Sequence, residues 1–406
     1  MLSQSDKEEF TMKQALEDIR VLDLSRVFAG PAGSMILGDL GADVIRVEAP
    51  GGTDSIRDWW PFVDNESTYY LSANRNKRAI TLNLKKASGK KLFLDLVKNA
   101  DVVIENFKTG TMERLGLAYS ALEKVNPKII MCSVTGYGQT GPFAKEPGFD
   151  PVLQAVGGLM DVTGQPDGEA TRVGLPVVDI MSSLYTVISI LSAIRIRDLT
   201  GEGQQIDISL LDVQVSSLAN VASSYLMKGN VSKRVGNNHN NIVPYQVFQC
   251  KDKPLMVACG NDRQFQKFSE ILGMPSWSKE AKFKTNAKRI QNREELTDKI
   301  QKIMVWKDAN EWFTLLSEKG VPSGPVNNVK EVFEHPQVQS RKMVEEIPHP
   351  TLGKVKLVRN PVIFSKTPIS IKKHPPLLGE HTELFLQQEM SLSKEDIDQL
   401  KEEGAI

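Results

Sequence analysis

Short runs of β-branched and other apolar residues alternate with longer amphipathic stretches along the first half of the chain. An apolar run at 19–24 is followed by a loop with glycine and proline, a helical pattern over 32–40 and a second apolar run at 44–47. This order is typical of a βαβ unit. The alternation continues, with strand-like runs at 77–84, 101–106 and 128–136 and a helical stretch at 86–100. We therefore predict an α/β fold in which helices cover a largely parallel sheet.

The pattern changes after about residue 226. Residues 240–262 predict a β-hairpin that turns at 251–254, and amphipathic stretches at 262–273 and 292–320 predict helices. A strand pair is expected within 349–365, followed by a proline-rich connector and two short C-terminal helices. The sequence thus predicts a second, smaller domain that begins near residue 241.

The composition is that of an ordinary globular protein. Of 406 residues, 40% are hydrophobic and 25% are charged, with 50 basic and 50 acidic side chains, so neither disorder nor a nucleic-acid partner is expected. We find no unbroken apolar run as long as a membrane-spanning helix, and we expect a soluble protein with no membrane partner. The length favours two or three domains.

Cysteines, histidines and the N-terminus bear on compartment and on metal binding. Three widely spaced cysteines, Cys132, Cys250 and Cys259, predict free thiols in a reducing compartment, and the five histidines show no metal-ligand spacing. The first 14 residues, MLSQSDKEEFTMKQ, fit neither a secretory signal nor a transit peptide and predict a short mobile leader. We expect a cytoplasmic protein, and a mitochondrial origin with a removed transit peptide stays open.

Asp179 is the single ionisable residue within 174–194, at the start of an otherwise apolar predicted helix. An aspartate in this position is typical of an N-cap. The positive end of the helix dipole favours the ionised carboxylate, which is also the form that acts as a nucleophile. Capping and catalysis are compatible, and the residues alone leave both open.

Three turns that contain glycine are candidate ligand loops. The first, FAGPAG at 28–33, lacks the GxGxxG pattern of dinucleotide sites, so a nicotinamide or flavin cofactor is not expected. Plain packing, or another phosphate-bearing ligand at the helix start, is favoured. The turns at 133–142 and 258–265 fit ordinary turns as well as they fit a ligand loop and a mobile lid. These residues support a two-domain α/β enzyme with a small-ligand cleft, without naming the reaction.

Eight stretches, taken together and in order, resemble the family III coenzyme A transferases. They are VLDLSRVFAGP, LGADVIRVEAPGGTD, NRNKRAITLNLK, DVVIENFKTGTMERLG, VTGYGQTGP, GFDPVLQAVGGLM, VGLPVVDIMSSLY and TGEGQQIDISLLD. The resemblance extends from about Ile19 to LLGEHT near the C-terminus. It implies that Asp179 attacks a donor acyl-CoA, that a mixed anhydride and an aspartyl-CoA thioester follow, and that an acceptor carboxylate takes the CoA. Coenzyme A and acyl-CoA are then substrates, and no permanently bound cofactor is implied.

The resemblance also implies roles for residues that would otherwise indicate ordinary surface or turns. Gly260 and Asn261 would supply backbone donors to the oxyanion. The positions implied for CoA are Val27, Ala29, Leu82, Lys85, Asn106, Phe107, Lys108 and Arg114. The candidate contacts for the acyl group are Arg26, Phe28, Arg75 and Arg172. The three arginines are candidates for a distal carboxylate, because arginine binds a carboxylate with two parallel hydrogen bonds.

The substrate class follows from finer likeness. ESTYYLSANRNK, NNIVPYQVF and GVPSGPVNNVKEVF resemble the succinyl-CoA:glutarate subgroup, which implies succinyl-CoA as donor and a dicarboxylate as acceptor. Formyl-CoA:oxalate and carnitine-type transfer are alternatives, although Arg26 and Phe28 replace the His and Gln of formyl-CoA transferases. A 2-methylacyl-CoA racemase is less favoured, because Phe149 stands where those enzymes carry a histidine base. A non-catalytic CoA-binding protein would not need Asp179.

The resemblance further implies a Rossmann-like large domain, a smaller α+β domain and an interlocked homodimer. We expect the N-terminal part of the large domain at 1–200, a linker at 201–240 and the small domain at 241–325. Residues 326–406 would form a second linker and a C-terminal part that returns to the large domain.

Overall fold

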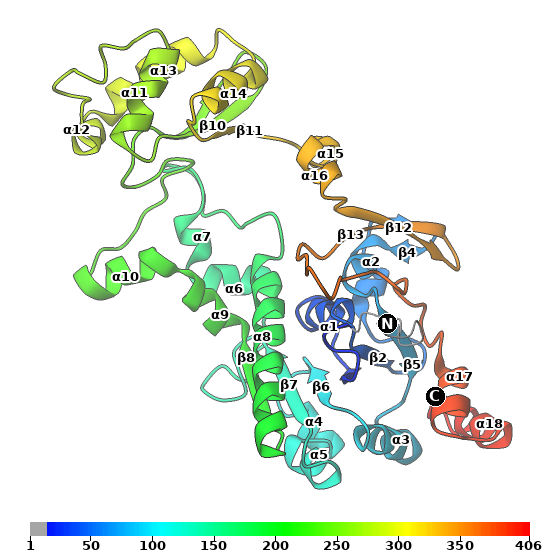
Figure 1. The fold of residues 1–406 in the computed structure, drawn as a ribbon. Helices are drawn as coiled ribbons and strands as arrows, with labels where there is room; N and C mark the ends of the chain where they lie inside the picture. The colour runs from blue at the N-terminus through cyan, green and yellow to red at the C-terminus, as the bar shows by residue number, and fades with distance from the viewer. Residues whose placement is uncertain (1–13) are drawn as a thin grey trace, which may run out of the picture. The chain divides into compact units, whose positions relative to one another are not determined.

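A computed structural model describes residues 14–406, so nearly all of the predicted leader lies outside the described residues. The chain forms two compact units (Figure 1). The first contains the chain up to Leu159, Arg172–Ser223 and Arg341–Ile406, and the second contains Met160–Thr171 and Ser224–Ser340.

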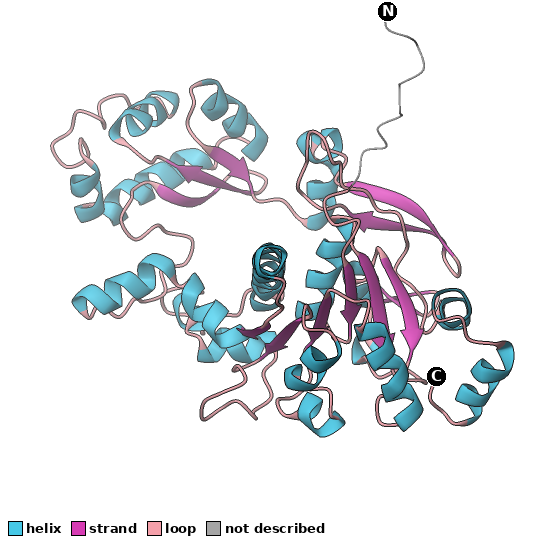
Figure 2. Cartoon of the chain, turned by 60° about the horizontal axis from the view of Figure 1, so that its bottom comes forward, coloured by secondary structure: helices cyan, strands magenta, loops and turns pink. Residues whose placement is uncertain are grey.

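A six-stranded parallel sheet forms the centre of the first unit (Figure 2). The strand order is β5-β2-β1-β6-β7-β8, and every neighbouring pair is parallel. This is the order of doubly wound nucleotide-binding sheets, and it reverses between β1 and β6. The predicted parallel sheet is confirmed. The strands are β1 (Arg20–Asp23), β2 (Asp43–Glu48), β5 (Lys77–Thr81), β6 (Val102–Glu105), β7 (Ile130–Thr135) and β8 (Gln205–Ser209).

Buried side chains alternate between the two faces of this sheet, as a sheet covered on both sides requires. Val21 and Val44 lie in the core with α1 (Ala29–Asp39) and α8 (Val177–Thr200). Their neighbours Leu22 and Ile45 lie in the core of the opposite face, with α3 (Ala87–Val97), α5 (Tyr119–Val125) and α17 (Thr382–Glu389). The sheet therefore forms the middle of three layers.

Helix α1 packs very closely against its neighbours. A side-chain carbon at Gly33 would come within 3.2 Å of Thr186 on α8, and one at Gly30 within 2.3 Å of Ser25. The helix begins three residues before the predicted start at 32, and Pro31 lies in its first turn, where a proline breaks no helical hydrogen bond.

The C-terminal segment of the first unit returns along the edge strand β5. The N–H of Asn76 donates to the carbonyl of Lys373, and the N–H of His381 donates to that of Ala79. The two predicted C-terminal helices are confirmed, and the predicted strand pair begins earlier, at Val344. The other elements of this unit are η1 (Ser55–Asp58), β3 (Phe62–Val63), β4 (Glu66–Ser67), α2 (Thr68–Ala73), α4 (Thr111–Leu115), α6 (Asp150–Val156), α9 (Leu210–Ser217), β12 (Val344–His349), β13 (Gly353–Val358) and α18 (Lys394–Glu402).

The second unit is built on a three-stranded antiparallel sheet in the order β11-β10-β9. The predicted hairpin is confirmed as β9 (Tyr245–Gln249) and β10 (Pro254–Ala258), and β11 is Ser323–Pro325. The stretch at 292–320 forms two helices, because Asp308 starts the second one with a capping box. The helices are α11 (Asp262–Ile271), α12 (Asn286–Gln291), α13 (Arg293–Met304), α14 (Ala309–Glu318), α15 (Val329–Glu334) and α16 (Pro336–Ser340); α7 (Leu159–Val162) and α10 (Ala219–Lys228) cross the boundaries between the units.

The segments expected as linkers contain regular structure. Strand β8 and helices α9 and α10 occupy much of 201–240, and α15 and α16 lie within 326–340. Strand β8 pairs with β7 and completes the central sheet. Its five residues, QIDIS, carry too short an alternation to be recognised as a strand without its partner.

Helix α8 is longer and more apolar than we expected of any segment from the sequence. Within the described residues, this one helix is long and apolar enough to cross a membrane by length and composition, with a mean hydropathy of 1.8. A long core helix of a globular domain passes the same test, and 44% of its most apolar window is buried inside the chain. The sequence inspection missed it because serines and Asp179 interrupt the apolar run.

Candidate active site

A cavity of about 310 Å³ lies at the carboxyl ends of β1 and β6, where the strand order reverses. Open α/β sheets bind their ligands in this crevice. The cavity brings together the turn after β1, the end of β6 and the start of α8. The sequence-predicted residues that line it are Arg26, Val27, Phe28, Ala29, Asn106, Phe107, Lys108 and Asp179.

The N-terminus of α8 is capped by a side chain from elsewhere in the chain. Pro176 occupies the N-cap position and cannot cap with its side chain. Oδ2 of Asp150 instead accepts the N–H of Val178 at 2.7 Å and the N–H of Asp179 at 3.2 Å. The predicted N-cap role of Asp179 was therefore wrong. Asp179 is the third residue of the helix, and its carboxylate is free of that task.

The carboxyl group of Asp179 is poorly solvated. The residue is 9% exposed, and no described residue donates a hydrogen bond to its carboxylate oxygens. Burial raises the pKa of Asp179 to about 7, and the charge of Asp150 adds to the rise. A helix dipole contributes about 0.3–1 kcal/mol, less than the roughly 1.4 kcal/mol of a single pKa unit. The predicted preference for the ionised form was wrong because desolvation is the larger effect.

The turn after β1 has a strained backbone that two side chains hold in place. Val27 has a φ of 63°, which is rare for a β-branched residue. Its N–H donates to Oδ1 of Asp54 at 3.0 Å. The amide of Asn106 accepts the N–H of Arg26 at 2.8 Å and donates to the carbonyl of Arg26 at 2.7 Å. These three hydrogen bonds offset strain that costs about 1–3 kcal/mol. The side chain of Asn106 is thus occupied by the protein itself.

Asp54 belongs to a buried cluster of ion pairs centred on Arg46. Arg46 is fully buried and pairs with both Asp54 and Glu48. Its guanidinium also donates to the carbonyl of Ser25 at 3.2 Å. Removing one partner of such a cluster leaves an uncompensated buried charge, which is strongly destabilising. The turn is therefore tied to the rigid core of the sheet.

Glu105, at the end of β6, is a buried acid that the sequence reasoning missed. Burial raises the pKa of Glu105 to about 7, and its Oε2 accepts the N–H of Phe107 at 2.8 Å. The carboxyl group thereby shapes the turn that carries Asn106, Phe107 and Lys108. An acid that ends an apolar run, as in DVVIEN, is the signal that could have found it.

The other positions expected to bind CoA do not line the cavity. Leu82 is 1% exposed and its side chain lies in the hydrophobic core, so the backbone of Leu82 is the part that a ligand could contact. Lys85 and Arg114 are exposed, and Arg114 donates to Oγ1 of Thr111 at 2.7 Å.

Gly260 and Asn261 belong to the second unit. Asn261 caps α11 by accepting the N–H of Gln264 at 2.9 Å, and the N–H of Gly260 donates to Oε1 of Gln264 at 2.8 Å. The Gly260 donor is thus already paired within its own turn.

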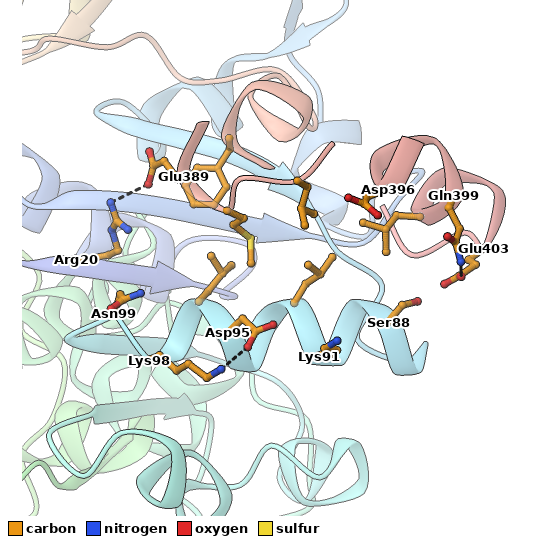
Figure 3. Close-up of a pocket in the computed structure, with 16 residues that line it drawn as sticks. Arg20, Ser88, Lys91, Asp95, Lys98, Asn99, Glu389, Asp396, Gln399 and Glu403 are labelled. Atoms are coloured by element: carbon orange, nitrogen blue, oxygen red, sulfur yellow. Dashed lines mark hydrogen bonds and ion pairs between the residues drawn. The ribbon is translucent and has the colours of Figure 1, made fainter. Parts of the chain in front are cut away.

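A larger cavity of about 550 Å³ lies elsewhere in the first unit, between α3 and the C-terminal helices α17 and α18 (Figure 3). Its walls carry paired charges: Arg20 donates to Glu389 at 2.9 Å, and Lys98 pairs with Asp95 at 2.6 Å. None of the sequence-predicted site residues lines it. The smaller cavity, with its unpaired carboxyl group, is therefore the candidate active site.

The fold and the site define an α/β enzyme with a doubly wound sheet, in which a buried carboxyl group lines a cavity at the point where the strand order reverses. The chain belongs to CoA-transferase family III, whose model matches residues 16–382.

Individual proteins show the same relationship. The chain is 42% identical over 392 residues to the human succinyl-CoA:glutarate CoA-transferase, covering 96% of this chain and 90% of that one. It is 41% identical over 376 residues to the succinate–glutarate CoA-transferase of Agrobacterium fabrum, covering 91% and 94%. A crystal structure of a CAIB/BAIF family protein from Brucella suis matches with a TM-score of 0.83 at 40% identity, covering 92% and 98%.

Proposed function

We propose that this enzyme moves coenzyme A from succinyl-CoA to a dicarboxylate such as glutarate, with Asp179 as the nucleophile. The observation that carries the proposal is the position of Asp179, whose unpaired carboxyl group shares a cavity with the turn after β1 and the end of β6. The substrates are those in the names of the human and Agrobacterium relatives.

The proposed reaction balances at each step. The Asp179 carboxylate attacks the thioester carbonyl of the donor and expels the CoA thiolate, which leaves a mixed anhydride. The thiolate then attacks the aspartyl carbonyl, which forms an aspartyl-CoA thioester and releases succinate. An acceptor carboxylate attacks that thioester, and the two steps run in reverse. Covalent catalysis divides one difficult exchange into easier steps, and a carboxylate with a raised pKa is more basic than one in water.

The oxyanions of these steps need hydrogen-bond donors. The proposed donors are the backbone N–H groups of Gly260 and Asn261. Because Gln264 already accepts the N–H of Gly260, this role requires the Gln264 side chain to exchange its place with the substrate oxygen. If the turn that carries Gly260 and Asn261 acts as a lid, its closure would also exclude water from the anhydride.

Coenzyme A is the only cofactor-like molecule in the proposal, and it is a substrate. Its proposed contacts in the cavity are the backbone of Val27 and Ala29 and the residues Asn106, Phe107 and Lys108. Lys85 and Arg114 are exposed cations that suit the phosphates by charge.

We also propose the interlocked homodimer. Helix α8 exposes an apolar face in the isolated chain, including Leu184 at 48% and Ile188 at 57% exposure. Large apolar faces of this kind mark association surfaces, and two-fold dimers are the commonest assembly. A cytoplasmic location stays a prediction, which the three free, buried cysteines fit.

The test is mass spectrometry of the acyl-CoA products after incubation with succinyl-CoA and a panel of acids. Glutaryl-CoA should form with the native protein and not with Asp179→Ala. Transfer to oxalate, formate or carnitine in its place would overturn the substrate assignment. Epimerisation of a 2-methylacyl-CoA without transfer would overturn the reaction, although the exposed Phe149 that lines the cavity offers no second base.

A further inference from the structure

Two of the three candidate arginines for a distal carboxylate have other partners. Arg75 is buried and donates two hydrogen bonds to Asp39, at 2.9 and 2.5 Å. The guanidinium of Arg26 lies 5.0 Å from the ring centre of Phe107, on the side of the cavity formed by the end of β6. Arg75 is thus excluded as a substrate contact, and Arg26 belongs to the side proposed for CoA.

Arg172 is the arginine of the three that lacks a strong partner. Its side chain is exposed, and its one hydrogen bond within the described chain is a long contact of 3.5 Å with the carbonyl of Val173. None of the ion pairs between described residues includes it. A guanidinium in this state keeps both parallel donors available for a carboxylate.

One side chain of α6 ties the segment of Arg172 to the segment of Asp179. Gln154 is fully buried. Its Oε1 accepts the N–H of Val173 at 2.8 Å, and its Nε2 donates to Asp150 at 2.5 Å. Asp150 in turn accepts the N–H of Asp179. The residue after Arg172 and the nucleophile are therefore held through one continuous hydrogen-bond network.

Tyr69 packs against an aromatic residue that lines the cavity. Tyr69 makes edge contacts with Phe28 at 5.9 Å and with Trp59 at 5.4 Å between ring centres, and Phe28 lines the cavity beside Asp179. Burial raises the pKa of Tyr69, the charges of Asp179 and Asp150 raise it further, and Arg172 lowers it. The charges of Asp179, Asp150 and Arg172 thus all act on the ionisation of this one hydroxyl.

We infer that Arg172 binds the distal carboxylate of a dicarboxyl substrate whose reacting carbonyl lies at Asp179 and whose methylene chain lies along Phe28 and Tyr69. This inference rests on the proposed function and assigns its substrate selectivity to one residue. The apolar rings suit the methylene chain, and the guanidinium of Arg172, which forms no ion pair among the described residues, suits the terminal charge. A monocarboxylate of the same length would leave Arg172 without a partner.

Glutarate and valerate provide the test, because they share a five-carbon chain and differ in the terminal carboxylate. The measured quantity is the ratio of kcat/KM for glutarate to that for valerate, with succinyl-CoA as donor. We expect Arg172→Met to lower this ratio by about 10- to 100-fold, the range of a lost charged hydrogen-bond pair. Arg172→Lys should give an intermediate ratio, because lysine keeps the charge and loses the two parallel donors. Arg26→Met is the matched control and should lower both values alike.

The ratio is internal to each variant, so partial loss of folded protein does not change it. Arg172→Lys serves as the test if Arg172→Met does not fold. An unchanged ratio in a variant that still transfers CoA would overturn the role of Arg172 and leave the proposed function standing. Native protein that transfers CoA to glutarate and valerate equally would overturn the role of Arg172 and the dicarboxylate preference, and would leave the transfer reaction and its nucleophile standing. Native protein that transfers CoA to no acid would overturn the proposed function and this inference together.

Discussion

The carboxylate of Asp150 accepts the backbone N–H of Asp179 at 3.2 Å, and its charge contributes to the raised pKa of the Asp179 carboxyl group. One side chain thus both caps the helix that carries the proposed nucleophile and adjusts its ionisation. The same carboxylate is bound by Gln154, which also holds the segment that follows Arg172. At the start of α8, helix capping and the ionisation of Asp179 thus depend on the same residue, Asp150.

The pH dependence of the rate should follow the ionisation of Asp179. The acid form is no nucleophile, so kcat/KM for succinyl-CoA should rise with pH and level off above a pKa of about 7. Asp150→Asn removes the neighbouring negative charge and should move this midpoint to lower pH. Steady-state kinetics between about pH 5 and pH 9 measure it. Glu105→Gln is the control, because Glu105 also has a pKa of about 7 and its loss should leave the midpoint unchanged. An equal midpoint in Asp150→Asn and native protein would contradict the electrostatic role of Asp150.

Asp179→Asn should stabilise the fold at high pH. The folded pKa of about 7 lies above the ordinary value of 3.8, so burial favours the neutral form and stability falls as the pH rises between those values. The variant carries no charge and escapes this loss. At about pH 8 its free energy of unfolding should exceed that of the native protein by up to about 4 kcal/mol, and near pH 4 the two should be similar. Urea unfolding at both pH values measures the difference, and a variant that is less stable at the higher pH would count against the buried-charge account.

Strain at Val27 should be coupled to the side chain of Asn106. Asn106→Ala removes two hydrogen bonds to Arg26 and should lower stability by about 1–3 kcal/mol and raise the KM for CoA. In a Val27→Gly background the same change should cost about 1 kcal/mol less, because glycine adopts a positive φ without strain. Double-mutant cycles by chemical denaturation measure this coupling. Asn126→Ala, which removes the amide bonds to the carbonyls of Val97 and Ala100 and the bond from the N–H of Lys128, should show no coupling with Val27→Gly. Equal coupling in both cycles would argue against a specific clamp.

The exposed face of α8 should lie in the dimer interface. A charge at Leu184 or Ile188, as in Leu184→Asp, would be desolvated there without a partner and should dissociate the dimer. Leu184→Ala, at the same position, should remain dimeric at micromolar concentration. Sedimentation velocity distinguishes these states. A native protein that sediments as a monomer at that concentration would remove the homodimer from the account.

The parts of the fold that follow from local sequence could be predicted, and those set by distant partners could not. Short-range patterns of apolar residues and turns predict the β1-α1-β2 unit and the β9–β10 hairpin. The start of α8 was misread because its cap is Asp150, 29 positions before Asp179, and local capping rules do not include such a partner. Strand β8 was missed because its evidence is the pairing with β7.

The candidate site shows the same division. Asp179 was found as an isolated acid in an apolar helix, but its pKa depends on burial that the sequence does not display. Tyr69 and Gln154 were missed because nothing in their local sequence separates them from ordinary helix residues. Arg75 was proposed on charge alone, and its partner Asp39 lies 36 positions earlier, at the end of α1.

The most direct test of the account is capture of the CoA thioester on Asp179. The protein is incubated with succinyl-CoA without an acceptor, quenched in acid, digested and examined by mass spectrometry. We predict a peptide containing Asp179 that carries the mass of CoA less one water, that is absent in Asp179→Asn and that disappears when glutarate is added before the quench. Formation of glutaryl-CoA with the adduct on another residue, or undiminished turnover by Asp179→Asn, would contradict the central claim that Asp179 carries the transferred group.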